Sequence, residues 1–133
     1  MINYQETASR WLAQAADDLA IAKKLFQSSD FSYTCFFAEQ SAQKSLKAFL
    51  IRNKEINITT HSITELLERA SSHNFIFKDL IETSGKKLDK YYLATRYPDA
   101  LPPSASLIPS KAYTKDEAEQ AVGISQTIFD LCD

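Results

Sequence analysis

The sequence predicts an all-α protein, an antiparallel four- to five-helix up-and-down bundle with one long proline-rich loop before the last helix. Glycine occurs only twice in 133 residues, far below the usual ~7%, which leaves little material for hairpin turns or phosphate-binding loops. Apolar residues recur every three or four positions over most of the chain, and all four prolines fall between Tyr97 and Thr114. Because half of this length would be short of a core, we expect a single domain over residues 1–133.

The first two helices form the longest periodic stretch. The first is expected from about Gln5 to Gln27, and the second from about Phe31 to Asn53. The segment Ser28–Asp30 interrupts the pattern between them and can cap the start of the second helix. The second helix has an apolar stripe spaced by three or four residues: Cys35, Ala38, Ala42, Leu46 and Phe49. This stripe predicts a helix that packs in the core.

The next two helices carry a capping signal and a break. A third helix is expected to begin near Ser62, because Ser62 and Glu65 have the spacing of a capping box. A fourth spans about Phe77 to Tyr97. Gly85 lies inside it and costs about 1 kcal/mol of helix propensity relative to alanine. This helix is therefore a candidate for division into two pieces.

The last helix is expected from Thr114, which has capping-box spacing to Glu117 and begins an apolar pattern that continues to Leu131. The segment before it holds prolines at positions 98, 102, 103 and 109, which exclude a continuous helix there. Long loops inside compact domains are often functional, so the residues that flank this one are candidates for a binding role.

Composition and charge exclude several classes of function. The net charge of −2 gives no general attraction to DNA or to an anionic membrane, and no apolar run is long enough to span one. No Gly-x-Gly-x-x-Gly, Walker or Gly-x-Ser-x-Gly motif is present, which disfavours dinucleotide-binding, P-loop and α/β-hydrolase functions. Cysteine and histidine lack metal-ligand spacing, so we expect neither a metal nor a cofactor. Buried, reduced Cys35 and Cys132 and an N-terminus without a secretion signal favour a cytoplasmic protein.

Three segments together resemble one known family. The first is Phe37–Leu50 (FAEQSAQKSLKAFL) in the second helix, and the second is His61–Leu67 (HSITELL) at the start of the third. The third is Thr95–Asp99 (TRYPD), at the end of the fourth helix. In order and spacing they resemble the HEPN domain family, and Trp11 followed by Asp17–Leu19 extends the likeness over almost the whole chain.

The resemblance implies a helical bundle that is commonly a homodimer. Such domains are often encoded beside a minimal nucleotidyltransferase and form a two-component, toxin–antitoxin-like system with it. Many members are ribonucleases with an Arg-x(4–6)-His motif near the end of the fourth helix. This chain departs from that motif, because no histidine follows Arg96, and Arg69 and His73 have only three residues between them on a different helix. The departure weighs against ribonuclease activity and leaves open whether the chain is an enzyme.

Five residues are candidates for a nucleotide site: Lys44, Lys47, Arg96, Tyr97 and Asp99. The two lysines belong to a second stripe of the second helix, where ammonium groups beside aromatic rings could hold a phosphate and a base. The same stripe could instead be a bundle seam or a dimer interface with packed lysine stems. Arg96 can fork onto two phosphate oxygens with Asp99 orienting it, or form a structural ion pair at a helix end. Tyr97 could stack a base.

Arg96 and His61 are the candidate catalytic residues, because a neutral imidazole just before a helix can act as an acid–base group. A lone histidine in this position more commonly caps or packs a loop. Three hypotheses of function follow. The chain is a nucleotide-binding homodimeric partner of a nucleotidyltransferase, a divergent metal-independent ribonuclease that uses Arg96, or a non-catalytic helical adaptor. In the ribonuclease hypothesis, His61 or Tyr97 substitutes for the missing histidine and RNA is the ligand.

Overall fold

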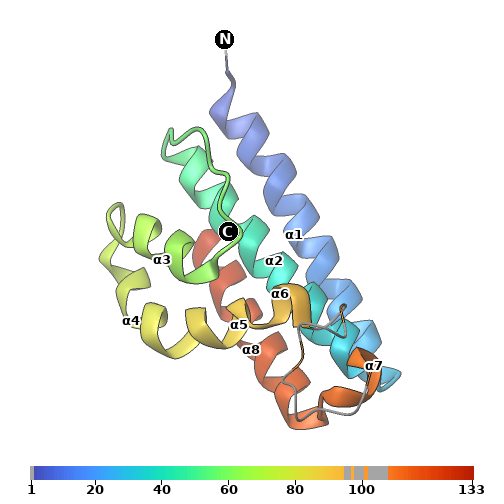
Figure 1. Ribbon diagram of the computed structural model, residues 1–133. Helices are drawn as coiled ribbons and strands as arrows, with labels where there is room; N and C mark the ends of the chain where they lie inside the picture. The colour runs from blue at the N-terminus through green and yellow to red at the C-terminus, as the bar shows by residue number, and fades with distance from the viewer. Residues whose placement is uncertain (1, 95–96, 98–100, 102–107) are drawn as a thin grey trace.

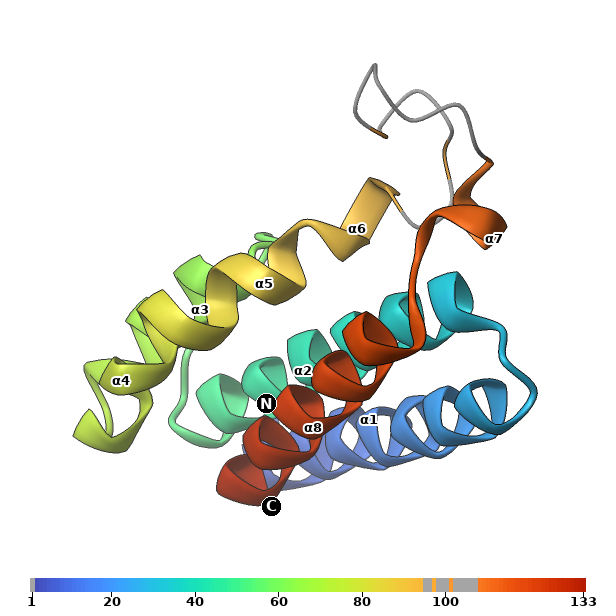
Figure 2. The same ribbon diagram turned by 90° about the horizontal axis from the view of Figure 1, so that it is seen from below.

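Three long helices form the body of the molecule. The computed structural model describes residues 2–94, 97, 101 and 108–133, and all regular structure in those residues is helical. Helix α1 spans Tyr4–Gln27, α2 spans Phe31–Arg52 and α8 spans Lys115–Cys132. The three pack along one another, and α2 contacts both of the others (Figures 1 and 2). The predicted helical bundle is confirmed, and none of the described helices is long and apolar enough to cross a membrane.

The remaining helices are short and mostly follow α2. Helix α3 spans Ile63–Ser71, and it is followed by the 3₁₀ turn η1 at Phe75–Phe77 and by α4 at Lys78–Leu80. The π-helical turn η2 at Ile81–Gly85 leads into α5 at Lys86–Asp89 and α6 at Tyr91–Ala94. The expected fourth helix is thus helical without a gap from η1 to the end of α5 and resumes as α6 after a turn at Lys90, with a change of helix type rather than a break at Gly85. A short helix, α7 at Pro109–Ala112, precedes α8 inside the proline-rich segment and begins with proline, where a missing N–H costs nothing.

Gly85 allows two of these pieces to approach each other closely. A Cβ atom placed on Gly85 would lie 2.8 Å from Thr64 Oγ1 and 3.1 Å from Thr64 Cα. Contacts this short are repulsive, so a residue without a side chain is needed where η2 meets α3. The sequence marked Gly85 as a weak point of a helix, and the structure gives it a packing role.

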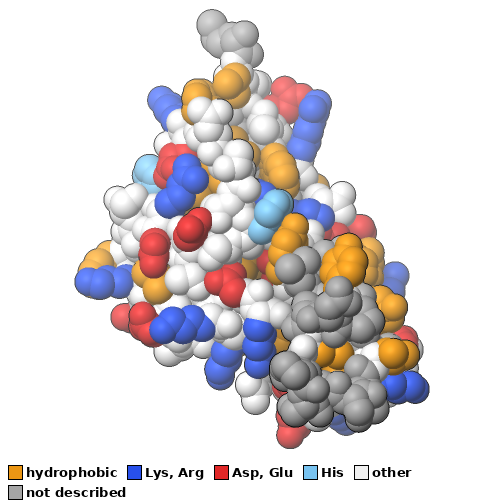
Figure 3. Space-filling view, viewed as in Figure 1, with side chains coloured by type: hydrophobic (Ala, Val, Ile, Leu, Met, Phe, Trp, Pro, Cys, Tyr) orange, Lys and Arg blue, Asp and Glu red, His pale blue; other side chains and the backbone are white. Residues whose placement is uncertain are grey.

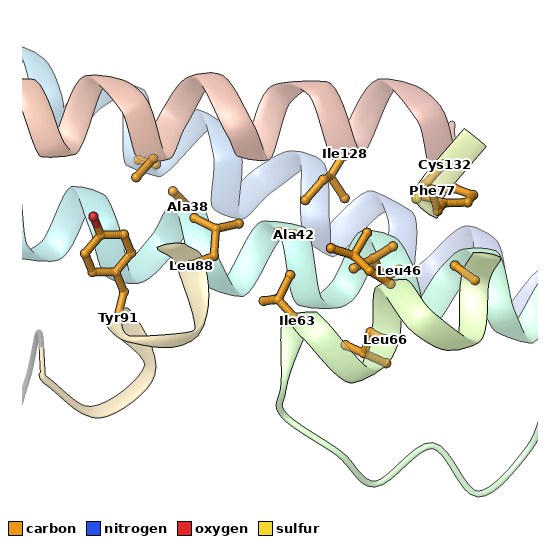
Figure 4. Packing of buried hydrophobic residues seen from close by; sticks show 14 of the residues in the cluster. Ala38, Ala42, Leu46, Ile63, Leu66, Phe77, Leu88, Tyr91, Ile128 and Cys132 are labelled. Carbon is orange, nitrogen blue, oxygen red and sulfur yellow. The ribbon is translucent and has the colours of Figure 1, made fainter. Parts of the chain in front are cut away.

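The core surrounds α2 on the side that faces α3, α5 and α8. Figure 4 shows Ala38, Ala42 and Leu46 of α2 next to side chains from these helices. Small residues on α2 let the neighbouring helices come close, and the predicted stripe is fully buried from Cys35 to Leu46. The side chains that pack against it from the other helices include Ile63, Leu66, Phe77, Leu88, Tyr91 and Ile128.

The helix starts are largely as the capping patterns predict. Ser62 Oγ and Thr114 Oγ1 each accept a hydrogen bond at 3.2 Å, from the backbone N–H of Glu65 and of Glu117. Asp30 stands at the start of α2, but its side chain makes no capping bond and accepts from Ser28 Oγ at 2.6 Å instead. Asp30 therefore occupies the expected capping position without making the capping hydrogen bond.

Candidate functional site

A row of polar side chains runs along the buried side of α2. Glu39, Gln43 and Lys47 follow one another at four-residue spacing and are 0%, 4% and 7% exposed. Gln43 Nε2 donates to Glu39 Oε2 at 2.9 Å, and Lys47 Nζ donates to Gln43 Oε1 at 3.2 Å. Buried polar groups are tolerated when they are paired, so this row is an internal network of the bundle with Gln43 at its centre.

Gln43 also determines which ring nitrogen of neutral His61 carries the proton. The Gln43 amide nitrogen faces two acceptors, the Glu39 carboxylate at 2.9 Å and the His61 carbonyl oxygen at 3.4 Å. Its amide oxygen lies 3.1 Å from His61 Nδ1 and also accepts from Lys47. An oxygen can only accept, so neutral His61 carries its proton on Nδ1. Nε2 then has a free lone pair, and no described residue forms a hydrogen bond with it.

The His61 ring packs face to face with Tyr92 of α6. The ring centroids are 4.9 Å apart and the planes differ by 13°. His61 itself is exposed at the surface, and Tyr92 stands four positions before Arg96 in the chain. The stack therefore brings His61 against the helix that leads to Arg96. Arg96 and Asp99 lie outside the described residues, whereas Tyr97 is described and is 51% exposed.

The two lysines proposed for phosphate binding contact α1. Lys44 Nζ forms an ion pair with Asp18 Oδ2 at 2.6 Å, and its side chain is 24% exposed. Lys47 Nζ lies over the ring of Trp11, 5.4 Å from the ring centroid. Burial lowers the pKa of Lys47, and the nearby charge of Glu39 offsets part of that shift. This stretch of α2 is thus a seam with α1, in which Lys44 remains partly open to solvent and Lys47 does not.

Asp89 of α5 holds the start of α3, which begins two residues after His61. Asp89 Oδ2 accepts from Ser62 Oγ at 3.0 Å and from Thr64 Oγ1 at 2.7 Å, and the same carboxylate also accepts from the backbone N–H of Ile63. A carboxylate at this place satisfies free N–H groups and complements the helix dipole. The position of His61 therefore depends on a residue far along the chain.

Sequence patterns do not point to Asp89, Gln43 or Tyr92 as members of this site. Asp89 is 27 residues from Ser62, and its contact exists only after α5 has packed on α3. The one available signal is the spacing of Glu39, Gln43 and Lys47, because polar residues repeated every four positions on a core helix must pair with one another.

Arg69 and His73, the near-match to the ribonuclease motif, both bind Glu55. Glu55 Oε1 accepts from Arg69 Nε at 2.9 Å, and Glu55 Oε2 lies 2.5 Å from His73 Nε2. Burial raises the pKa of Glu55, but the hydrogen bonds from Arg69 and His73 outweigh it and the net shift is downward. The three residues form a clip between the α2–α3 connection and the end of α3.

Comparison with known proteins gives consistent results. The model of the HEPN domain family matches residues 8–133. The crystal structure of TT1696 from Thermus thermophilus aligns with a TM-score of 0.85 at 35% identity and covers 94% of both chains. The structure of ST0689, described as an archaeal HEPN homologue, aligns with a TM-score of 0.73 at 27% identity over 94% of this chain and 93% of its own.

A more distant relative comes from Methanocaldococcus jannaschii. Its name is "Putative toxin MJ1304", and it is 25% identical over 136 aligned positions, which cover 93% of this chain and 84% of the relative. A HEPN domain protein from Thermotoga maritima is similar in structure, with a TM-score of 0.69 and 29% identity over 92% of this chain and 93% of its own. In each case the likeness extends over the whole bundle rather than over one helix pair.

Proposed function

The chain belongs to the HEPN domain family, and on that basis we propose that it is the single-domain, homodimeric and nucleotide-binding component of a two-component, toxin–antitoxin-like system. Its partner would be a minimal nucleotidyltransferase. The toxin name of the Methanocaldococcus jannaschii relative supports the class of system. The observation that carries the binding role is the exposed His61 ring stacked on Tyr92, with Nε2 free among the described residues.

The nucleotide would bind at this stack of His61 on Tyr92 of α6. Flat rings at a surface favour stacking of a base, and His61 Nε2 can accept a hydrogen bond from a base or a ribose hydroxyl. The guanidinium group of Arg96 would donate two hydrogen bonds to phosphate oxygens. Tyr97 and Asp99 would also belong to this site. Lys44 would join by exchanging Asp18 for phosphate. Lys47 is 7% exposed and would act on the site through Gln43.

Exposed apolar residues near the start of α2 and around α6 and α7 support a dimer contact or a contact with a partner protein. Tyr33 near the start of α2, Tyr97 and Ile108 are all large and exposed. Figure 3 shows hydrophobic side chains gathered beside the grey residues at the lower right, where Figure 1 places α6 and α7. Apolar surface of this kind is typical of protein–protein contacts.

Nucleotide titration and co-purification test this proposal. ATP and AMP should bind saturably by calorimetry, and Arg96→Ala and His61→Ala should each weaken binding at least tenfold while the melting temperature stays nearly constant. Arg10→Ala, an exposed cation on α1, is the control. Tagged protein from the native host should retain a small nucleotidyltransferase in stable stoichiometry. Recovery of a homodimer alone would contradict the two-component system, and absence of saturable nucleotide binding would favour the helical adaptor.

A divergent ribonuclease is the second candidate, and the Nδ1–H form of His61 favours it. In that reaction the RNA 2′-hydroxyl oxygen attacks the adjacent phosphorus while His61 Nε2 takes the hydroxyl proton. The bond from phosphorus to the 5′-oxygen breaks, that oxygen takes up a proton, and a 2′,3′-cyclic phosphate remains. Arg96 would stabilise the charge that develops on the phosphoryl oxygens.

Cleavage of RNA in the presence of EDTA tests the ribonuclease. Activity should be lost in both His61→Asn and Arg96→Ala, since each removes a different part of the chemistry. Activity that persists in these variants would come from a contaminating enzyme.

A further inference from the structure

A second pocket lies at the end of α2 that is away from α7. A cavity of about 230 Å³, partly open to solvent, is lined by the first turns of α1, the last turns of α2 and the connection to α3. These three segments lie together at one end of the molecule in Figures 1 and 2. The residues that line the cavity are mainly apolar or aromatic and include Tyr4, Trp11, Ile51 and Ile58. Such a cavity is suited to an apolar ring or chain.

One buried cation faces this apolar lining. Lys47 lines the cavity, is 7% exposed, and makes a single hydrogen bond, to Gln43 Oε1 at 3.2 Å. Among the described residues it forms no ion pair within 4.0 Å of a carboxylate. An ammonium group has three donors, so two remain for other contacts, one side of the group being covered by the Trp11 ring. Burial lowers the pKa of Lys47, and the nearby charge of Glu39 offsets only part of that shift.

The acidic residue in the lining does not supply that anion. Glu55 also lines the cavity, but both of its carboxylate oxygens are bound, one by Arg69 of α3 and the other by His73 just after α3. The negative charge of Glu55 is therefore balanced by its own partners, and Glu55 would not repel an anionic ligand strongly. Lys47 is the cation among the described residues that line the cavity.

We propose that this cavity binds a small aromatic carboxylate, with its ring against Trp11 and Tyr4 and its carboxylate on Lys47. An apolar cavity of about 150 Å³ is large enough for benzene. The 80 Å³ or so beyond that volume would hold a short arm that ends in a carboxylate. A carboxylate on Lys47 would form a charge-assisted hydrogen bond in a water-poor environment, where such bonds are strong. This site shares Lys47 with the nucleotide site proposed above, but its other lining residues differ and its test involves neither nucleotide nor RNA.

The probe is 3-phenylpropionate, and the matched neutral probe is 3-phenylpropanol, which keeps the ring and the chain. Trp11 is the only tryptophan of the chain, so its fluorescence reports directly on the cavity while calorimetry gives the affinity. We expect saturable binding of the acid with a change in Trp11 emission, and binding of the alcohol at least tenfold weaker. Equal affinity for both probes, or no saturable binding of the acid, would overturn the proposal.

Two variants test separately the charge of Lys47 and the volume of the cavity. Lys47→Met keeps the length of the side chain, removes the charge, and should weaken binding of the acid at least tenfold with little effect on the alcohol. Thr7→Phe keeps Lys47 and fills the cavity from α1, so it should abolish binding of both probes. Lys24→Met makes the same chemical change as the first variant at an exposed position of α1 and should leave both affinities unchanged. Unchanged binding of the acid in Thr7→Phe would place the ligand elsewhere and overturn the proposal even if Lys47→Met did not fold.

Discussion

Thr64 Oγ1 donates a hydrogen bond to Asp89 Oδ2 at 2.7 Å, across 25 positions of sequence. Asp89 Oδ2 also accepts hydrogen bonds from the Thr64 backbone N–H at 3.2 Å and from Ser62 Oγ at 3.0 Å. This carboxylate therefore holds the start of α3, directly after His61 in the chain. Stability and site geometry are thus coupled at Asp89.

Replacement of Asp89 by asparagine should therefore be costly. Hydrogen bonds to a charged group contribute about 1.5–3 kcal/mol, and an amide cannot replace a carboxylate that only accepts. We expect Asp89→Asn to lower the free energy of unfolding in urea by about 2–3 kcal/mol. Asp17→Asn, at an exposed position of α1, should change it by less than about 0.5 kcal/mol. A similar small loss in both variants would show that Asp89 is not needed to hold α3.

Replacement by alanine should have opposite effects on stability at the two glycines, Gly85 and Gly123. At Gly85 an added Cβ would meet Thr64 Oγ1 at 2.8 Å, whereas at Gly123 of α8 it would meet nothing within 4 Å. Gly123→Ala should raise the free energy of unfolding by about 0.5–1 kcal/mol through helix propensity and a less flexible unfolded chain. Gly85→Ala should lower it by about 1–3 kcal/mol, because overpacking exceeds the same propensity gain. Thermal unfolding of both variants checks this, and stabilisation by Gly85→Ala would show that α3 can move away without cost.

Local patterns predict the bundle well, but they predict the site only in part. The stripe from Cys35 to Phe49 and the capping residues Ser62 and Thr114 encode their structures within one or two helical turns. Asp89 acts on α3 only after the chain has folded back, and nothing near Asp89 in sequence marks that contact.

The π-helical turn after α4 is also not marked by a local pattern. The sequence places a glycine in the expected fourth helix, and the structure adds that the π-helical turn ends at Gly85, where α3 lies close. For the same reason, periodicity placed Lys44 and Lys47 on one stripe without revealing that Asp18 and Trp11 of α1 contact them.

The ion pair of Lys44 with Asp18 should contribute more to stability than an ordinary surface pair. Asp18 is buried, and its other oxygen accepts from Gln14 Nε2 at 3.0 Å. Removal of one partner of a buried pair leaves an uncompensated charge. We expect Lys44→Met to lower the free energy of unfolding by about 2–3 kcal/mol. The exposed pair of Arg10 and Glu6 is the control, and Arg10→Met should cost less than about 1 kcal/mol. Equal losses would mean that solvent screens both pairs alike.

Stability should fall at alkaline pH because of the two buried thiols. Burial raises the pKa of Cys35 and of Cys132 to about 12. Below about pH 8.5 both thiols are protonated in the folded and unfolded states, so their contribution is fully present. Above that pH the unfolded chain loses these protons first, and each thiol lowers stability by up to about 1.4 kcal/mol per pH unit until the folded pKa is reached. The lowered pKa of Lys47 acts in the opposite sense over part of this range.

Urea unfolding between pH 7 and pH 10 measures this effect. The double variant Cys35→Ala, Cys132→Ala is expected to be less stable at pH 7 because it creates space in the core. Its stability should nevertheless decline less steeply above pH 8.5 than that of the native sequence. Parallel slopes would show that the thiols are not the groups that ionise on unfolding.

The hydrogen bond from His61 Nδ1 to Gln43 Oε1, 3.1 Å between the two atoms, predicts a single neutral form of this imidazole. In ¹⁵N NMR spectra at a pH where His61 is neutral, Nδ1 should carry the proton and Nε2 should show the signal of an unprotonated nitrogen. Gln43→Leu removes the acceptor, so the Nε2–H form, which usually predominates for a free imidazole, should then appear in the spectrum. His73 binds Glu55 through Nε2 and should keep its own form in both proteins, which makes it an internal control. A native protein with His61 protonated on Nε2 would contradict the role of Gln43, and it would remove the free lone pair on which base catalysis by His61 depends.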